Sequence, residues 1–392
     1  MTTPSPTPPP DVRVGPFLQN PSTTDMTVAW IRSGSEECSL RYGIDGRAPT
    51  SVKVSPLRPI EESSDSFYAA RLTGLQPGTR HDYTLSTPGG EYSSYFRTFP
   101  EDPASFSFIY YGDNKSGHDM HRKLGRLFDQ HAPWFAMHSG DMTDHGGYEE
   151  YRTFLFDPVR DVIDHLPFFP GRGNHEGDGK AYRQVFCLPG GETWYSFDLG
   201  GAHFVVLDTT GWRHAWEKDD VRRMYDWLEA DLAAAARATW KIVMHHEPSY
   251  DLGWRKDDWG RKDFLPLMRR GGVDLTFSGH AHGYQRLRPM IAAGENDGHP
   301  ITHVISAGAG AAIGERTLDE SPFLVCQARR FNYVPVTIEG GRLTARVLSD
   351  EDELLDEFVL EKHGGSYAPS VLDQALPAED YGDPDSLRSA FG

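Results

Sequence analysis

Five short apolar runs recur through the middle of the chain, and each is followed within a few residues by aspartate, asparagine or histidine. The runs are residues 106–111, 134–137, 166–170, 240–244 and 273–277. Short apolar runs bounded by glycine or other turn residues are typical of buried strands. Ligands of open α/β sheets bind at the carboxyl ends of the strands. The pattern therefore predicts that the polar residues after these runs meet at one edge of a sheet.

Each of these polar residues also has an ordinary structural explanation when it is considered alone. An aspartate after glycine is most often a helix N-cap, an asparagine suits a turn, and one of two adjacent histidines is expected to be simple packing. Their joint occurrence in one domain instead favours a metal site, and alternate histidines in an extended segment could serve two adjacent ions. The residues are Asp113, Asp141, Asn174, His175, His245, His246, His280 and His282.

Oxygen and imidazole ligands without thiolate suit Zn, Mn, Fe or Ni better than calcium or a soft metal. A carboxylate shared by two ions holds them about 3.5–4 Å apart, which is the two-metal geometry of phosphoryl transfer. The cysteines do not add to this set, because Cys38, Cys187 and Cys326 are scattered and odd in number. We expect them to be buried thiols.

The chain divides by pattern into two domains and two tails. Residues 1–12 form a Pro-rich tail, and alternating runs at 26–30, 39–43 and 81–85 predict an all-β sandwich over residues 13–102. Over residues 103–362 strands alternate with helices expected at 118–130 and 219–236, and the domain closes with strands at 302–306, 333–338 and 343–348. Residues 363–392 are rich in Pro, Asp and Gly and are expected to be a tail.

The amino-acid composition and charge argue against some classes of binding partner. The 392 residues carry a formal net charge of −18, which argues against nucleic acid binding because phosphate backbones are bound by basic surfaces. No stretch is long and apolar enough to span a membrane, and the first ten residues lack the apolar core of a signal peptide. We therefore expect a cytoplasmic protein, or a secreted or periplasmic one whose leader was removed.

Five blocks in the second domain resemble the signature motifs of calcineurin-like metallophosphoesterases, and most closely those of purple acid phosphatases. The blocks are Gly112-Asp113, Gly140-Asp141, Gly173-Asn174-His175-Glu176, Val243-Met244-His245-His246-Glu247-Pro248 and Gly279-His280-Ala281-His282. Tyr284-Gln285-Arg286 also resembles the Tyr-Glu-Arg after the last histidine pair of that family. The resemblance covers about residues 14–350. It implies an α/β fold, a metallophosphoesterase-type β-sandwich flanked by helices, preceded by a smaller fibronectin type III-like sandwich.

The resemblance also implies roles for individual residues. Asp141 would bridge two metal ions and be essential for catalysis, with Asp113 and His282 on the first ion. Asn174, His246 and His280 would hold the second ion, and His246 is preferred to His245 because Pro248 follows it at the family's spacing. His175 would bind substrate phosphate and assist protonation of the leaving group, or alternatively orient Asp141 or a water molecule. The cofactors would be two divalent or mixed-valence ions of Zn, Mn or Fe.

The sequence departs from the family at the first metal. Purple acid phosphatases place a tyrosine where this chain has Asp144, and calcineurin-type relatives place a histidine where it has Lys115. We hypothesise that Asp144 or Asn114 fills the gap, so that the protein uses a divalent pair and is not purple.

Four residues could bind the substrate phosphate. Lys115, His175, Arg255 and Lys256 would form a cationic rim, although Arg255 and Lys256 could equally be surface charges.

The expected function is hydrolysis of phosphate monoesters of small molecules by a metal-bound hydroxide. One alternative is a phosphodiesterase for nucleotide or lipid head-group diesters, with a cleft lined by Trp212, Trp216, Trp254 and Trp259. Another is a binding module whose catalytic domain has a degenerate metal site. The sequence leaves a homodimer open.

Overall fold

Two seven-stranded sheets pack face to face in the larger part of the molecule. The computed structural model describes residues 7–210, 218–252, 259–291, 299–314, 321–372 and 374–377. The first sheet has the order β11-β10-β9-β20-β21-β22-β23 and the second β12-β13-β14-β15-β18-β16-β19. In each, parallel strands carry the motif-bearing loops and antiparallel strands complete the sheet. The predicted mixed α/β fold is confirmed.

The strands of the first sheet are β9 (Ser105–Tyr111), β10 (Ala136–His138), β11 (Phe168–Pro170), β20 (Asn332–Glu339), β21 (Arg342–Ser349), β22 (Leu354–His363) and β23 (Ser366–Tyr367). Those of the second are β12 (Tyr195–Leu199), β13 (Ala202–Val206), β14 (Trp240–His245), β15 (Leu275–Ser278), β16 (Tyr284–Leu287), β18 (Thr302–Ser306) and β19 (Leu324–Ala328). A short pair joins β17 (Met290–Ile291) to β24 (Leu376–Pro377).

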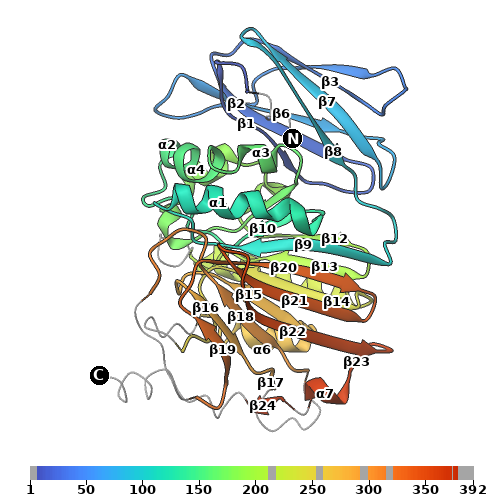
Figure 1. The fold of residues 1–392 in the computed structure, drawn as a ribbon, viewed down its shortest axis with the longest axis vertical. Coiled ribbons are helices and arrows are strands. Elements are labelled where there is room, and N and C mark those ends of the chain that lie inside the picture. The colour runs from blue at the N-terminus through green and yellow to red at the C-terminus, as the bar shows by residue number, and fades with distance from the viewer. Residues whose placement is uncertain are drawn as a thin grey trace.

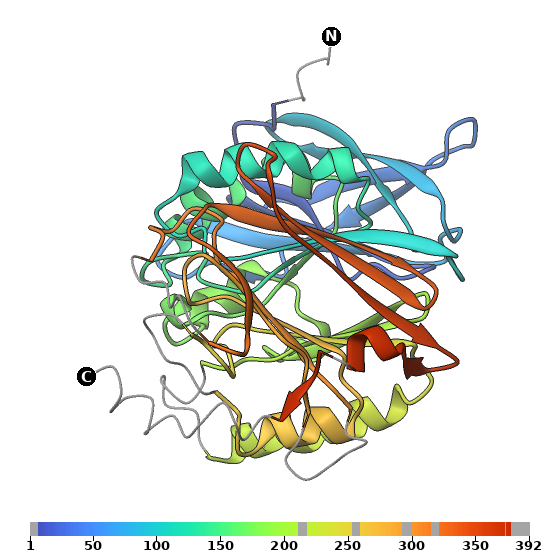
Figure 2. The same cartoon turned by 60° about the horizontal axis from the view of Figure 1, so that its bottom comes forward.

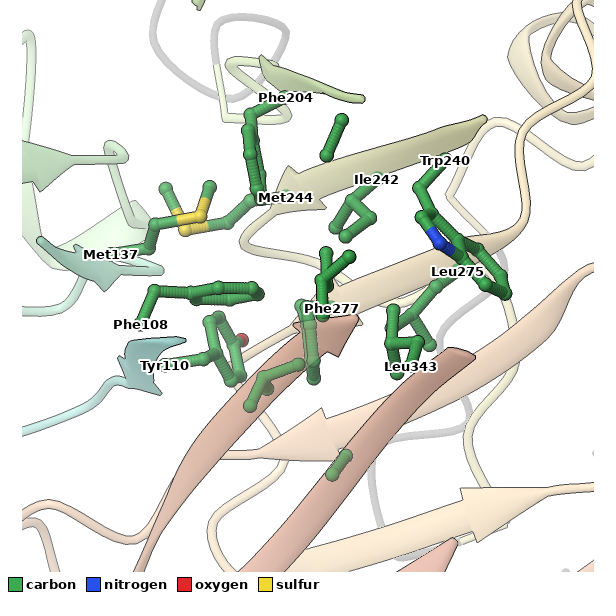
Figure 3. Packing of buried hydrophobic residues seen from close by; sticks show 14 of the residues in the cluster. Phe108, Tyr110, Met137, Phe204, Trp240, Ile242, Met244, Leu275, Phe277 and Leu343 are labelled. Carbon is green, nitrogen blue, oxygen red and sulfur yellow. The ribbon is translucent and has the colours of Figure 1, made fainter. Parts of the chain in front are cut away.

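The main core fills the space between these two sheets. Figure 3 shows Phe108 and Tyr110 from β9 facing Phe277 from β15, with Met137 and Met244 beside them. The Tyr110 and Phe277 rings stack with their centroids 4.2 Å apart. Because both inner faces are apolar, the two sheets are held in fixed relation, and so are the loops at their strand ends.

Helices cover the outer faces of the sandwich. Figure 1 shows α1 to α4 above the first sheet, and Figure 2 shows α5 and α6 beneath the second. The helices are α1 (His118–Phe128), α2 (Tyr148–Glu150), α3 (Arg160–Ile163), α4 (Lys180–Val185), α5 (Lys218–Ala234), α6 (Phe264–Arg270) and α7 (Pro369–Leu372). Shorter turns are the 3-10 helices η1 (Asp129–His131), η3 (Asn174–Glu176) and η4 (Pro189–Gly191) and the π-helix η2 (Tyr151–Phe156). The helices predicted at 118–130 and 219–236 correspond to α1, continued by η1, and to α5.

Two four-stranded sheets, β1-β2-β6-β5 and β4-β3-β7-β8, form the N-terminal sandwich. Its strands are β1 (Val12–Gln19), β2 (Met26–Ser33), β3 (Cys38–Gly43), β4 (Thr50–Val54), β5 (Arg58–Pro59), β6 (Asp65–Leu72), β7 (Arg80–Thr87) and β8 (Gly90–Arg97). Leu18 and Trp30 point into this sandwich, whereas Phe17 and Ile31 point out of it and pack with the helices of the larger part. One sheet is therefore buried on both faces.

The first residues of the expected C-terminal tail are ordered. Tyr367 in β23 and Val371 in α7 are buried in the main core, and the Tyr367 hydroxyl donates to Asp274 Oδ1 at 2.8 Å. These two side chains, together with the pairing of β23 with β22, hold the segment against the sheet. Residues 378–392 of the predicted tail lie outside the described part of the chain.

Candidate metal centre

The loops after five parallel strands converge at one end of the sandwich. In the first sheet the last residues of β9, β10 and β11 lie side by side, with Tyr111 opposite His138 and His138 opposite Pro170. The loops themselves are joined, because Asp113 N donates to Gly140 O at 3.1 Å. Between the sheets, His280 N donates to both oxygens of Asp113, at 3.0 and 3.1 Å. The convergence predicted from the apolar runs is therefore present.

Three residues of this end have left-handed backbone conformations. The φ angles of Asp113, Asp141 and His280 are 61°, 57° and 67°. Non-glycine residues seldom adopt this region, and such residues cluster at functional sites where the surrounding structure enforces them. The backbones also approach closely, since a Cβ on Gly173 would lie 2.3 Å from Asp141 N. The loops are thus shaped to place particular side chains.

One group of ligand atoms surrounds His246 Nε2. It lies 3.2 Å from Asp141 Oδ1, 3.1 Å from Asn174 Oδ1 and 3.1 Å from His280 Nδ1. The other ring nitrogen, Nδ1, donates to Ser139 O at 3.0 Å. In the neutral ring this bond keeps the proton on Nδ1 and directs the lone pair of Nε2 at the group, which is how a ligating histidine is commonly oriented. The residues predicted for the second metal are all here.

The neighbouring group contains Asp113, Asp141 and His282. His282 Nε2 lies 3.5 Å from Asp113 Oδ1 and is buried without a hydrogen-bond partner, while Nδ1 donates to Ala312 O at 2.7 Å. An unpartnered buried imidazole nitrogen costs free energy, and a metal ion would satisfy it. The residues predicted for the first metal therefore also lie together.

These donors fit metal ions of the divalent or iron type. Within the described ranges, two groups of acidic and histidine ligand atoms could hold a metal, and both contain Asp141. The donors are carboxylate, amide and imidazole, with no thiolate, which suits Zn, Mn or Fe. Burial would raise the pKa of Asp141, but the His246 and Lys115 charges outweigh it and hold that pKa well below its usual range. Asp141 is therefore ionised.

Glu176 organises the same loops, and the sequence analysis gave it no role. Its buried carboxylate accepts the backbone N–H groups of Asp141 at 2.8 Å, Met142 at 2.7 Å and Thr143 at 3.2 Å, and also that of Gly173. Burial and the Asp141 charge raise the pKa of Glu176 to about 7. The signal that the sequence offered for Glu176 was a carboxylate in the same motif as Asn174. Glu176 fixes the backbone on both sides of Asp141.

Lys115, which was expected to bind substrate phosphate, contacts a candidate metal ligand in this structure. Its Nζ donates to Asp141 Oδ2 at 2.6 Å, and its side chain is only 8% exposed. In the described structure this ammonium is therefore paired with the carboxylate shared by both groups.

His175 lies at the surface of the centre. Its Nδ1 donates to Asp144 O at 2.8 Å, and its Nε2 lies 4.0 Å from Asp141 Oδ2. The side chain is 33% exposed, so solvent or a substrate can reach it. The backbone N–H of His175 donates to Asp141 Oδ1 at 3.0 Å. The position suits both roles considered for His175, contact with a substrate and orientation of Asp141.

The residues considered for the missing first-metal ligand are close in sequence but differ in environment. The Asp144 carboxylate accepts the Ser116 hydroxyl and belongs to neither group of ligand atoms. Asn114 Nδ2 donates to Phe154 O at 2.7 Å, and its Oδ1 is buried without a hydrogen-bond partner. Asn114 Oδ1 is therefore without a hydrogen bond, whereas the Asp144 carboxylate is engaged.

Of the remaining residues considered in the sequence, two that the structure describes do not enter the centre. His245 is buried behind it, with Nδ1 donating to Glu247 O at 2.8 Å, and burial lowers its pKa to about 4. Trp259 stacks on Phe264 with ring centroids 4.8 Å apart and is a loop anchor. The others lie outside the described residues, namely Trp212, Trp216, Trp254, Arg255 and Lys256.

Known proteins are similar to this chain in sequence and in fold. Residues 108–284 match the family model of the calcineurin-like phosphoesterases. An acid phosphatase of Aspergillus ficuum is 31% identical over 71% of this chain and 72% of its own length. Acid phosphatase type 7 of Danio rerio is 27% identical over 89% of this chain and 90% of its own.

Among solved structures, a purple acid phosphatase from yellow lupin (Lupinus luteus) superposes with a TM-score of 0.76 at 18% identity, covering 93% of this chain and 76% of that one. None of the helices described here has the length and apolarity needed to cross a membrane. The chain therefore belongs to the calcineurin-like phosphoesterase family, among purple and acid phosphatase relatives, and is a phosphoric ester hydrolase of the phosphatase type.

Proposed function

We propose that the chain hydrolyses phosphate monoesters of small molecules with a pair of metal ions. The observation that carries this proposal is the sharing of Asp141 by two adjacent groups of ligand atoms. In this proposal Asp141 would bridge the ions. Asp113 and His282, with Asn114 or Asp144, would hold the first ion, and Asn174, His246 and His280 would hold the second. A pair of this kind, when bound, polarises the phosphoryl oxygens and makes water a better nucleophile.

The residues around the pair have separate tasks. His175 is oriented by its bond to Asp144 O, so that in the protonated ring Nε2–H can donate to a phosphate oxygen or to the leaving oxygen. The chain has a net charge of −18, and an anionic substrate therefore needs local positive charge. Lys115, Arg255 and Lys256 are the proposed sources of that charge besides the metal ions.

The proposal is tested on the purified protein by elemental analysis together with assays of matched esters. Hydrolysis of p-nitrophenyl phosphate and bis(p-nitrophenyl) phosphate is compared after metal removal and after addition of Zn, Mn or Fe. We expect two metals per chain and faster hydrolysis of the monoester. Faster hydrolysis of the diester would make the protein a phosphodiesterase. One metal or none, with no activity after any supplement, would favour the binding-module alternative.

A variant pair links activity to the shared carboxylate. Asp141→Asn should lower kcat/KM by more than about 100-fold, since even partners of metal ligands cost 10–100-fold. Asp119→Asn, in the exposed first turn of α1, is the matched control and should be unchanged. Full activity of the Asp141→Asn protein would refute the bridging role.

A further inference from the structure

The two oxygens of Asp141 have different partners. Oδ1 lies 3.2 Å from His246 Nε2 and accepts the His175 backbone N–H at 3.0 Å. Oδ2 accepts Lys115 Nζ at 2.6 Å. One oxygen therefore belongs to the group around His246, and the other is occupied by an ammonium group.

Lys115 is held in this position by its own backbone. It is the second residue after Asp113, and its backbone N–H donates to Asp141 O at 3.1 Å. Main chain and side chain thus both contact Asp141. The ammonium is buried, and Asp141 is the carboxylate with which it pairs among the described residues.

An ammonium and a metal ion compete for the same oxygen. The ammonium has no lone pair and cannot be a ligand, yet it carries the positive charge that compensates a buried carboxylate. A cation that enters between Asp113, Asp141 and His282 must take Oδ2 from Lys115 or accept a positive charge close by. A cation entering beside His246 uses Oδ1, whose neighbour His246 Nε2 at 3.2 Å can itself become a ligand, which the ammonium cannot.

Resting on the proposed two-metal function, we propose that Lys115 is a built-in competitor of the first metal ion and makes metal loading ordered. The group of Asp141, Asn174, His246 and His280 fills first and tightly. The group of Asp113, Asp141 and His282 fills second, more weakly, and only as Lys115 leaves Oδ2. Together with His246, the same ammonium compensates the buried Asp141 charge when no metal is bound.

The test is a titration of the metal-free full-length protein with Mn²⁺. Calorimetry and the electron paramagnetic resonance signal of free Mn²⁺ both monitor the binding. The wild type should bind two ions in steps whose affinities differ at least tenfold. Lys115→Met should tighten the weaker step at least tenfold and leave the tighter step unchanged. Lys115→Arg keeps the charge and should keep the weak step.

Three controls make the result interpretable. Lys241 is another buried lysine, whose Nζ donates to Gly271 O at 2.7 Å, and Lys241→Met should reproduce the wild-type titration. His282→Ala should remove only the weaker step, and His246→Ala only the tighter one. If thermal unfolding shows that Lys115→Met does not fold, Lys115→Gln replaces it, because the amide can still donate to Asp141.

Two negative outcomes are distinguishable. The proposed role of Lys115 as a competitor is overturned if Lys115→Met leaves the affinity of the weaker step unchanged while His282→Ala still abolishes that step. If neither histidine variant alters Mn²⁺ binding, the metal centre itself is misassigned and the proposed function fails with it.

Discussion

At the scale of single residues, Glu176 shows how a side chain that touches no substrate can determine a site. Its carboxylate accepts four backbone N–H groups from the loops after β10 and β11. Those loops carry Asp141, Asn174 and His175. Four donors surround one carboxylate, and their hydrogen bonds are strongest to its ionised form, so the loop geometry depends on this one group.

Replacing Glu176 should loosen the centre. In Glu176→Gln the amide NH₂ would face backbone N–H donors, so part of the network would be lost. We expect Mn²⁺ affinity to fall by about 10–100-fold and the melting temperature to drop. Glu149→Gln, an exposed residue paired with Arg152, is the control. Unchanged Mn²⁺ affinity in Glu176→Gln would show that Glu176 does not position the loops.

His165 gives the stability of the protein a predictable dependence on pH. Burial would lower its pKa, but Asp129 and Asp164, which flank the ring, raise the pKa to about 9 from 6.5. The folded state therefore binds a proton more tightly than the unfolded chain. The stabilisation is fully present below pH 6.5 and is lost as the pH rises through 9.

A pH series of denaturant unfolding checks this. His165→Gln should be about 1–3 kcal/mol less stable than wild type near pH 6, and the difference should shrink by pH 9.5. The exposed residue His363 provides the control His363→Gln. A penalty that stays constant over this range would mean that His165 acts through packing alone.

At the scale of elements, the π-helix η2 connects the N-terminal sandwich to the metal loops. The Phe156 ring lies 4.9 Å from Phe17 of β1. Two residues earlier, Phe154 O accepts Asn114 Nδ2 at 2.7 Å and His121 Nδ1 at 2.9 Å. Short π-helical segments are frequent at functional sites. Here the segment joins a packed aromatic pair to a residue beside Asp113.

Truncating Phe17 should affect stability far more than an exposed change in the same sandwich. Phe17→Ala should cost about 3–5 kcal/mol, as is usual for a buried phenylalanine. Leu57→Ala, at a residue that is 58% exposed, should stay within about 0.5 kcal/mol. Urea unfolding measures both. Equal effects would mean that the contact between sandwich and η2 contributes little.

At the scale of the whole molecule, the N-terminal sandwich and the larger part share one core. Val14, Phe17 and Ile31 belong to the same buried cluster as Leu124 and Phe156. Polar contacts add to it, because Arg58 donates to Gln184 O at 2.9 Å and to Phe186 O at 2.6 Å. We propose that the boundary near residue 102 separates two sequence patterns within one cooperative unit.

Differential scanning calorimetry distinguishes one unit from two. We expect a single transition for the full chain, whose calorimetric and van't Hoff enthalpies agree. A fragment of residues 103–362 should expose the apolar partners of Phe17 and aggregate or melt lower. Two resolved transitions, or a fragment as stable as the full chain, would contradict a shared core.

The sequence by itself was enough to predict the strands that end in polar residues at the centre, and the family. The period of a strand and the glycine and turn residues that end it are local features of the sequence. Five apolar runs that end in Asp, Asn or His were therefore enough to predict that Asp113, Asp141 and His280 converge. The family spacing to Pro248 likewise favoured His246, which lies with Asp141, whereas His245 is buried behind the centre.

Only the tertiary structure decided the contacts between those elements. Lys115, named for the cationic rim, pairs with Asp141, Glu176 collects donors from two loops, and Phe17 faces η2. Each outcome depends on side-chain direction and on residues distant in the chain, such as Lys115 and Asp141, which are 26 positions apart. Local pattern specifies which residues stand at a strand end, and packing between elements specifies what they touch.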